Sequence, residues 1–367
     1  MAAIDRLFKL MRDKGGSDLH LAEGQPPKYR VHGHIAAIDG EPVLTRDSIT
    51  AYLQEITPPH HWERYVRKGD ADFAYAMGTS DRFRANLLKQ VQGFGAVFRI
   101  IPVKILTLEQ LSAPPKLGDL ARLRNGLVLV TGPTGSGKST TLAGMINEIN
   151  ENYARHILTI EEPIEFVHPA KKSVLTQREV GEHTKSFASA LRAAAREDCD
   201  VILVGEMRDL ETIGLAVSAS EMGVLVFGTL HTNSAAKTID RIVNVFPPGQ
   251  QPQIRTMLAG SLRGVVSQLL CRKKDGKGRV AVQEIMTTNT AVQAAIREGK
   301  IAKLNSIIAS GSQEGMITMD DALQRRLDAE TISATEAYMK CFDKKRFEPA
   351  MLEEKEAEAA SGQPASH

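Results

Sequence analysis

The residues with the clearest chemical meaning lie in the segment GPTGSGKS, at positions 132–139. The segment matches the pattern G-x-x-x-x-G-K-[ST], follows an apolar run at 127–130, and precedes apolar residues at helical spacing. A glycine loop between a strand and a helix binds phosphate through backbone N–H groups and the positive end of the helix dipole. Lys138 would reach the β- and γ-phosphates of a nucleotide, and the Ser139 hydroxyl would bind Mg²⁺.

We therefore predict ATP and Mg²⁺ as cofactors. The predicted ATP contacts from this loop are Thr134, Gly135, Ser136, Gly137, Lys138, Ser139 and Thr140.

Hydrolysis of a phosphoanhydride also needs carboxylates that hold the metal or activate water. Glu206 ends the apolar segment DVILVGE, where it is placed to bind Mg²⁺ through water or to activate the attacking water. Glu165 ends the acidic segment EEPIE at 161–165, for which a solvated acidic loop is the alternative. His231 follows another apolar run and is predicted to sense the γ-phosphate or to hold a neighbouring acid; a buried, hydrogen-bonded histidine is the other interpretation.

Cations that face the γ-phosphate are the remaining requirement. Arg82, Arg84 and Arg99 lie well before the glycine loop, in a region with a different sequence pattern. As phosphate contacts they would act from another subunit, and the alternative is that they are ordinary surface arginines.

The elements that position these residues follow from the apolar periodicity. Four apolar runs, at 127–130, 157–160, 201–204 and 224–227, alternate with helical patterns, which is typical of a parallel sheet covered on both faces. Each run ends in polar residues. Because ligands bind at the carboxyl ends of parallel strands, we expect these ends to converge on one nucleotide.

The rest of the chain divides by changes of pattern. The fold class expected is α/β. We predict an α+β domain at 1–100, a proline-bounded linker at 101–118, an ATPase domain at 119–285, a helical region at 286–348 and a disordered tail at 349–367. The segment 254–270 is predicted to be a helix that leads into a hairpin around Asp275 and Gly276.

Composition limits the possible partners. The 367 residues carry a net charge of +2, without the basic stripe that favours nucleic acid, so no nucleic-acid partner is expected. No apolar run is long enough to cross a membrane, and we expect no direct membrane insertion. The three cysteines are widely spaced, which favours neither structural zinc nor disulfides and fits a cytoplasmic location.

Several motifs together resemble those of the secretion-type hexameric ATPases, and more closely the PilT-type retraction ATPases of type IV pili. The likeness extends from GGSDLHL near the N-terminus to about residue 345. The blocks that carry it are GPTGSGKSTT (Walker A), TIEEPIEFVH at 159–168, QREVG at 177–181, DVILVGEMRDLET at 200–212 (Walker B) and GTLHTNSAAKTIDRIVNVFP at 228–247.

This resemblance implies a PAS-like N-terminal domain, a RecA-like ATPase domain and a homohexameric ring. Glu165 and Glu206 would be the catalytic and Mg²⁺-associated acids, and Arg82, Arg84 and Arg99 would contact nucleotide phosphates. The implied function is ATP-driven pilus retraction (twitching motility). The motor would act on a platform protein at the inner-membrane base of the pilus machine, with a second retraction ATPase as a further possible partner.

The chain departs from this family's usual pattern at several positions. Val224 replaces the first of two usual histidines, Gln92 stands where an arginine is common, and AVQAAIRE at 291–298 only partly matches the block tied to retraction. The alternatives are therefore an accessory PilU-like subunit or a nucleotide-binding adaptor ring. A DNA-translocating relative is disfavoured by the near-neutral charge.

Overall fold

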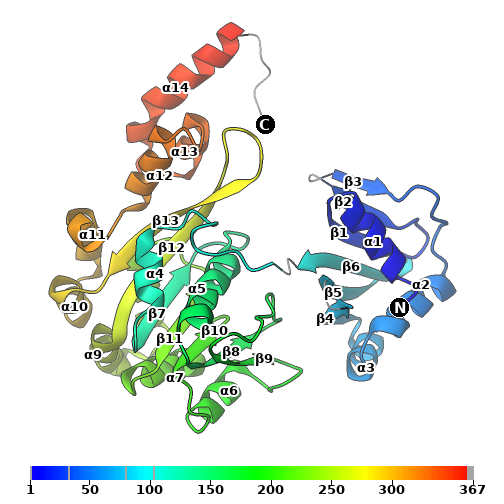
Figure 1. Ribbon diagram of the computed structural model, residues 1–367, viewed down its shortest axis with the longest axis horizontal. Coiled ribbons are helices and arrows are strands. Elements are labelled where there is room, and N and C mark those ends of the chain that lie inside the picture. Colours follow the sequence, from blue (N-terminus) through cyan, green and yellow to red (C-terminus); the bar gives the residue numbers. More distant parts are fainter. Residues whose placement is uncertain (1, 32–33, 79–80, 102–103, 362–367) are drawn as a thin grey trace. The chain divides into compact units, whose positions relative to one another are not determined.

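The computed structural model describes residues 2–31, 34–78, 81–101 and 104–361, with the side chains of 358–361 excepted. The fold is mixed α/β, and its elements are labelled in Figure 1. The chain forms two compact units. Unit 1 comprises Met1–Lys104 with Pro163–Val167, and unit 2 comprises Ile105–Glu162 with His168–His367.

Unit 1 is built on a six-stranded antiparallel sheet with the order β3-β2-β1-β6-β5-β4. Its strands are β1 (Gly16–Ala22), β2 (Lys28–Val31), β3 (His34–Ala37), β4 (Asp70–Met77), β5 (Asp81–Gln90) and β6 (Gly93–Ile101). Its helices are α1 (Asp5–Asp13), α2 (Arg46–Ile56) and α3 (Pro59–Lys68). Unit 1 thus combines an antiparallel sheet with three helices among its described residues.

Aromatic packing joins α1 to the sheet of unit 1. The Phe8 ring stacks on Phe83 of β5, with 4.1 Å between ring centroids, and meets Phe98 of β6 edge-on. All three side chains are fully buried. Stacked and edge-on aromatic pairs each add about 0.5–1.5 kcal/mol beyond area burial. The apolar face of α1 is therefore fixed against the central strands.

Unit 2 contains a seven-stranded sheet with the order β13-β12-β7-β11-β10-β8-β9. Its strands are β7 (Gly126–Thr131), β8 (His156–Glu161), β9 (Val174–Glu179), β10 (Val201–Val204), β11 (Leu225–Leu230), β12 (Leu262–Arg272) and β13 (Arg279–Thr287). Every neighbouring pair is parallel except β12 and β13, which form an antiparallel hairpin. The four apolar runs are thus confirmed as adjacent parallel strands.

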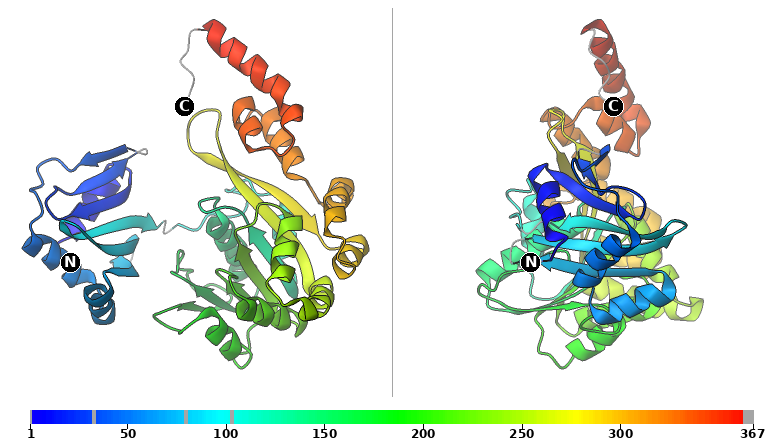
Figure 2. Two further views of the ribbon diagram at one scale, coloured as in Figure 1. Left: turned by 180° about the vertical axis from the view of Figure 1, so that it is seen from behind. Right: turned by 90° about the vertical axis from the view of Figure 1, so that its right-hand side faces the viewer.

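Helices cover both faces of this sheet, as the two sides in Figures 1 and 2 show. The helices are α4 (Pro115–Ala121), α5 (Lys138–Asn152), α6 (Phe187–Ala194), α7 (Leu210–Glu221), α8 (Ala235–Asn244) and α9 (Gln251–Ser261). One buried cluster joins α4 and α5 to the sheet, and another joins α6, α7, α8 and α9 to its other face. Strands buried on both faces read as continuous apolar runs, which explains the sequence pattern.

The structure corrects two predictions in unit 2. The segment 254–270 is not one helix, because α9 ends at Ser261 and β12 begins at Leu262. The expected linker at 101–118 contains the start of α4, where Leu117 is fully buried, while residues 102–103 lie outside the described residues.

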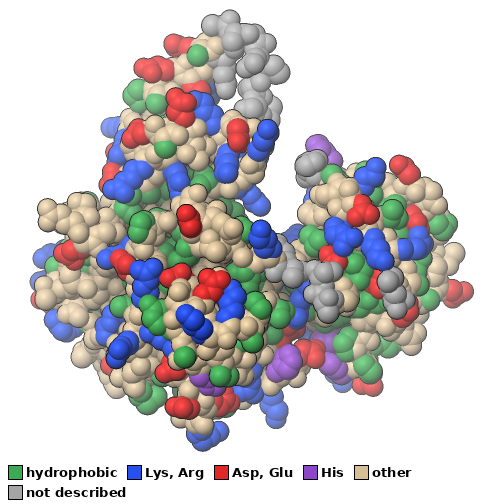
Figure 3. Space-filling model, in the orientation of Figure 1, with side chains coloured by type: hydrophobic (Ala, Val, Ile, Leu, Met, Phe, Trp, Pro, Cys, Tyr) green, Lys and Arg blue, Asp and Glu red, His purple; other side chains and the backbone are tan. Residues whose placement is uncertain are grey.

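The C-terminal part of unit 2 is helical, as predicted. It contains α10 (Thr290–Arg297), α11 (Leu304–Ser310), α12 (Met319–Asp328), α13 (Ala334–Lys340) and α14 (Lys344–Ser361). The prediction of a disordered tail from 349 is wrong up to Ser361, because α14 continues through a segment rich in strong helix formers. Residues 362–367 of that tail lie outside the described residues. In the space-filling view, acidic and basic side chains intermix over these helices (Figure 3).

Candidate functional site

The glycine loop joins the end of β7 to the start of α5, as the sequence predicts. Gly132, Gly135 and Gly137 have φ angles of 146°, 77° and 84°, which favour glycine. A Cβ atom on Gly132 would lie 2.3 Å from the backbone oxygen of Gln268, a contact that the fixed strand β12 cannot relieve. The loop is therefore a backbone cradle that fits a phosphate group and excludes side chains at its first glycine.

Lys138 and the neighbouring residues complete the cradle. The Lys138 Nζ donates hydrogen bonds to the carbonyl oxygens of Gly132 (2.8 Å) and Pro133 (3.1 Å). This places the ammonium over the loop at the N-terminus of α5, where positive charge favours phosphate. Of the other predicted contacts, Thr134 and Gly135 are exposed, Gly137, Ser139 and Thr140 are half-buried, and Ser136 is buried.

A buried glutamine that the sequence analysis missed holds the loop in place. Gln268 of β12 is 1% exposed, and its Nε2 donates to the carbonyl oxygen of Ser136 at 2.6 Å. Its Oε1 accepts from Thr141 Oγ1 of α5 at 2.8 Å and from Gln283 Nε2 of β13 at 3.0 Å. One side chain thus ties the loop, the first turn of α5 and the hairpin together.

Glu206 lies just beyond the end of β10, at the same edge of the sheet as the glycine loop. Arg208 binds its carboxylate in a bidentate manner, with Nε–Oε1 and Nη2–Oε2 distances of 2.6 Å. The Nε2 of His231, just beyond β11, lies 3.1 Å from Oε1. Burial acts to raise the pKa of Glu206, but the bonds and charges of Arg208 and His231 outweigh it and hold the pKa below its usual value. The carboxylate is therefore kept ionised.

The structure decides between the two interpretations of His231. Its side chain is 47% exposed and contacts an acid, so it is not a buried histidine of the core. Arg208 was not singled out from the sequence. The only signal for it is the spacing of two residues from Glu206, which is too general to identify a partner.

The strand ends that carry these residues are held by backbone contacts. Gly205 N donates to Ile160 O of β8 at 2.8 Å, and Met207 N donates to Thr229 O of β11 at 3.0 Å. The hydroxyl of Thr229 also donates to the carbonyl oxygen of Gly205. These bonds fix the backbone on both sides of Glu206, so the direction of its side chain is set by the sheet.

The remaining predicted residues belong to unit 1. Glu165 is half-buried in the irregular segment Pro163–Val167. Arg84 and Arg99 are directly paired across β5 and β6, and Arg82 is on the same face of β5 two residues away. Arg84 and Arg99 are exposed, and Arg99 Nε donates to Asp18 Oδ1 at 2.7 Å. The structure thus gathers the three arginines on one sheet face.

Comparisons with known proteins assign the chain to a family. The model of the type II/IV secretion system protein family matches residues 2–275. The chain belongs to this family. It is 52% identical to a twitching motility protein of Neisseria gonorrhoeae over 81% of this chain and 79% of that protein. It is 49% identical to the type IV pilus retraction ATPase PilT of Pseudomonas aeruginosa over 88% of this chain and 93% of that protein.

A solved structure supports the same assignment. The crystal structure of the pilus retraction motor PilT with bound ADP superposes with a TM-score of 0.87 at 42% identity. The match covers 95% of this chain and 99% of that one. Within the family, the chain is therefore a PilT-type protein over nearly its whole length. No helix among the described residues is long and apolar enough to span a membrane.

Proposed function

We propose that this chain is the ATP-hydrolysing subunit of a motor that retracts type IV pili. The observation that carries the proposal is the site itself. A glycine cradle with Lys138 and an ionised Glu206 lie at the carboxyl edge of one parallel sheet, in a chain that matches a pilus retraction motor along nearly its whole length. The chemical class, an ATPase of the secretion family, follows from the same relatives.

In this proposal each residue has a distinct task. Lys138 and the N–H groups of the loop bind the β- and γ-phosphates. Ser139 would hold Mg²⁺, which would supply positive charge beside the phosphates. Glu206 would help to hold Mg²⁺, and Arg208 and His231 fix the orientation of its carboxylate. Glu165 is the carboxylate that activates the attacking water.

The assembly proposed is a homohexamer in which unit 1 is PAS-like and unit 2 contains the RecA-like ATPase domain. Arg82, Arg84 and Arg99 then serve the nucleotide of a neighbouring chain, since their shared sheet face supplies three cations at once. The ring works in the cytoplasm, at the inner-membrane base of the pilus machine. Its partners are the platform protein there and a second retraction ATPase.

Phosphate release by the purified full chain with Mg²⁺ and ATP tests the enzymatic part. The wild type should turn over well above a Lys138→Ala control. Glu206→Gln should keep binding of a fluorescent ATP analogue and lose about 10²-fold or more in turnover, because the residue acts on metal and water. Equal loss of binding and turnover would show that Glu206 is structural.

A deletion strain tests the direction of the motor. Excess pili without surface motility are expected if the chain drives retraction. Cells without pili would instead assign the chain to pilus assembly and overturn the proposal.

A further inference from the structure

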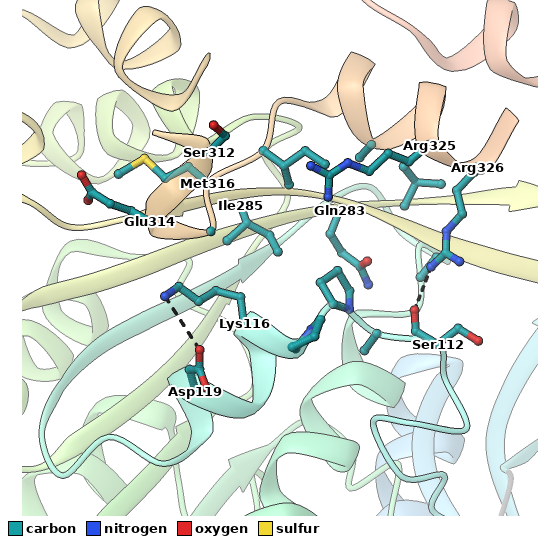
Figure 4. Close-up of a pocket in the computed structure, with 18 of the residues that line it drawn as sticks. Ser112, Lys116, Asp119, Gln283, Ile285, Ser312, Glu314, Met316, Arg325 and Arg326 are labelled. Carbon is teal, nitrogen blue, oxygen red and sulfur yellow. Dashed lines mark hydrogen bonds and ion pairs between the residues drawn. The ribbon is translucent and has the colours of Figure 1, made fainter. Parts of the chain in front are cut away.

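A cavity of about 640 Å³ lies in unit 2, between the segment that leads into α4, the strand β13 and the C-terminal helices. Figure 4 shows Lys116 and Asp119 of α4 on one side, Arg325 and Arg326 of α12 on the other, and Gln283 of β13 between them. Small-molecule sites are typically about 300–1,000 Å³. The cavity is therefore large enough for a ligand the size of a nucleotide or a comparable organic molecule.

The charges around this cavity favour an anion. Arg326 is half-buried, and its Nη2 donates to the carbonyl oxygen of Ser112 at 2.8 Å. Among the described residues, neither Arg326 nor its neighbour Arg325 forms an ion pair; the charge of Arg325 acts at longer range on Asp321, and no carboxylate acts on Arg326. Burial lowers the pKa of Arg326, which is the signature of a cation with little counter-charge. A ligand anion would supply that charge.

The acidic residues of the wall do not remove this preference. Glu314 accepts two hydrogen bonds from Asn289 Nδ2, at 3.0 and 2.9 Å, and keeps its charge. The three cations of the lining, Lys116, Arg325 and Arg326, still exceed its two acids, Asp119 and Glu314, by one. Asp119 lies 3.8 Å from Lys116 Nζ, and both side chains are partly exposed, so this ion pair contributes little. The ammonium of Lys116 is therefore available to a stronger anion.

Apart from Ser112, Gln283, Ser312 and Gln313, the uncharged lining is apolar. Pro114, Ile285 and Met316 face the cavity from three different segments. The flexible thioether of Met316 suits a flat apolar body, because methionine adapts its shape to aromatic partners. The backbone of Ser112 at the rim has a φ of 51°, uncommon for a residue other than glycine, and its carbonyl is the one that Arg326 binds.

The floor of the cavity connects directly to the glycine loop. Gln283 lines the cavity and donates to Gln268 Oε1 at 3.0 Å. Gln268 is the residue that holds the Ser136 carbonyl and Thr141. Two hydrogen bonds thus separate a ligand at Gln283 from the backbone that binds phosphate, and both lie in a buried region where such bonds are strong.

We propose that this cavity is a regulatory site for an organic anion with a flat apolar body, and that its occupant changes nucleotide affinity at the glycine loop through Gln283 and Gln268. Arg325, Arg326 and Lys116 bind the acidic group of the ligand. The site is separate from the ATP site, and it gives the motor an input besides ATP.

The binding part is tested with 8-anilinonaphthalene-1-sulfonate, a fluorescent anion with an aromatic body. Titrations use the full chain with saturating Mg²⁺ and ADP, so that the nucleotide site is closed to the probe. The Lys116→Ala/Arg325→Ala double variant should raise the probe's Kd at least about tenfold, the scale of one lost charge-assisted bond. The uncharged N-phenyl-1-naphthylamine should bind both proteins alike.

The matched control is Arg297→Ala, which removes an exposed arginine of α10 that does not line the cavity. It should leave the Kd of both probes as in the wild type. Circular dichroism confirms that each variant is folded. A double variant that binds the anionic probe like the wild type would overturn the proposed site, as would an equal loss in the Arg297→Ala protein.

The regulatory part is tested by linkage. The factor by which the saturating probe changes the Kd for ADP must equal the factor by which ADP changes the Kd for the probe. We expect a factor of about five or more in the wild type, the lower end of measured couplings, and a factor of one in the Lys116→Ala/Arg325→Ala variant, which separates coupling from competition of the probe at the nucleotide site. Gln283→Met should bring the factor to one, because the bond to Gln268 is lost, while Arg297→Ala keeps it. A wild-type factor of one would refute the regulatory role.

Discussion

Replacing Gln268 with methionine is the sharpest test of how the site is held. The side chain makes three hydrogen bonds, to the Ser136 carbonyl, to Thr141 and to Gln283. Methionine has nearly the same volume and length but cannot make these bonds, so the packing around the 1%-exposed position should be preserved. The change therefore isolates the polar contribution.

The magnitude follows from these contacts. A net value of about 1 kcal/mol for each hydrogen bond gives a loss of about 3 kcal/mol in the free energy of unfolding. The Ser136 carbonyl is also released, so the loop must be ordered again when nucleotide binds. If that reordering costs about 1.4 kcal/mol, the Kd for ADP rises about tenfold.

The assay is urea unfolding of the full chain combined with ADP titration. The single tryptophan, Trp62, lies in unit 1, so circular dichroism rather than tryptophan fluorescence should follow unit 2. The control is Ile296→Ala, a change at a fully buried position of α10. It should lower the free energy of unfolding by about 2–5 kcal/mol, similar to the loss in Gln268→Met, without changing the Kd for ADP. An unchanged Kd in Gln268→Met, or an equal rise in the control, would refute a role for Gln268 in positioning the loop.

Three further predictions concern single residues. Arg208→Ala should lower ATP turnover about tenfold while ADP binding persists, because Glu206 loses its bidentate partner; unchanged phosphate release would contradict this. Gly132→Ala should abolish nucleotide binding, since its Cβ meets a backbone oxygen at 2.3 Å, whereas Gly181→Ala, with φ 92° but open space, should not. Burial lowers the pKa of His168 to about 4 from 6.5, so the folded chain resists a proton that the unfolded chain accepts. Stability should therefore fall by about 3 kcal/mol as the pH drops from 6.5 to 4, and His168→Gln should remove that part of the slope in acid unfolding curves.

The fold of unit 2 was predictable where burial gives an unambiguous pattern. Runs of apolar residues bounded by polar ones identified β7, β8, β10 and β11, since parallel strands are covered on both faces. The same criterion failed at β12, where α9 ends at Ser261 and the strand begins at Leu262 with no loop between them. Leu258, Leu262 and Val266 are all buried and recur every four residues, so the helical period continues into the strand.

The site was predictable only as far as local motifs reach. The glycine loop, Glu206 and His231 belong to short segments that can be recognised in the sequence, and the structure places them at one edge of the sheet. Gln268 does not belong to a segment of this kind. Its role depends on pairing with Gln283 across the hairpin and on the distant Ser136, contacts that a single sequence does not reveal. The Arg208 pairing with Glu206 likewise depends on how the chain turns after β10.

Buried hydroxyl groups connect the strands β7 and β12 to α8, the helix that follows His231. Thr131 of β7, Ser267 of β12 and Thr238 of α8 are fully buried, and their hydroxyls are linked at 2.9 Å and 3.5 Å. The N-terminus of α8 is tied to Glu284 of β13, which accepts from Ala235 N at 2.7 Å and whose pKa burial raises. Because a buried polar group left without its partner costs about 1–3 kcal/mol, these strands and α8 resist sliding past one another. Changes in nucleotide state should therefore be expressed in the exposed groups at the sheet edge, Arg208 and His231, rather than in the register of the sheet.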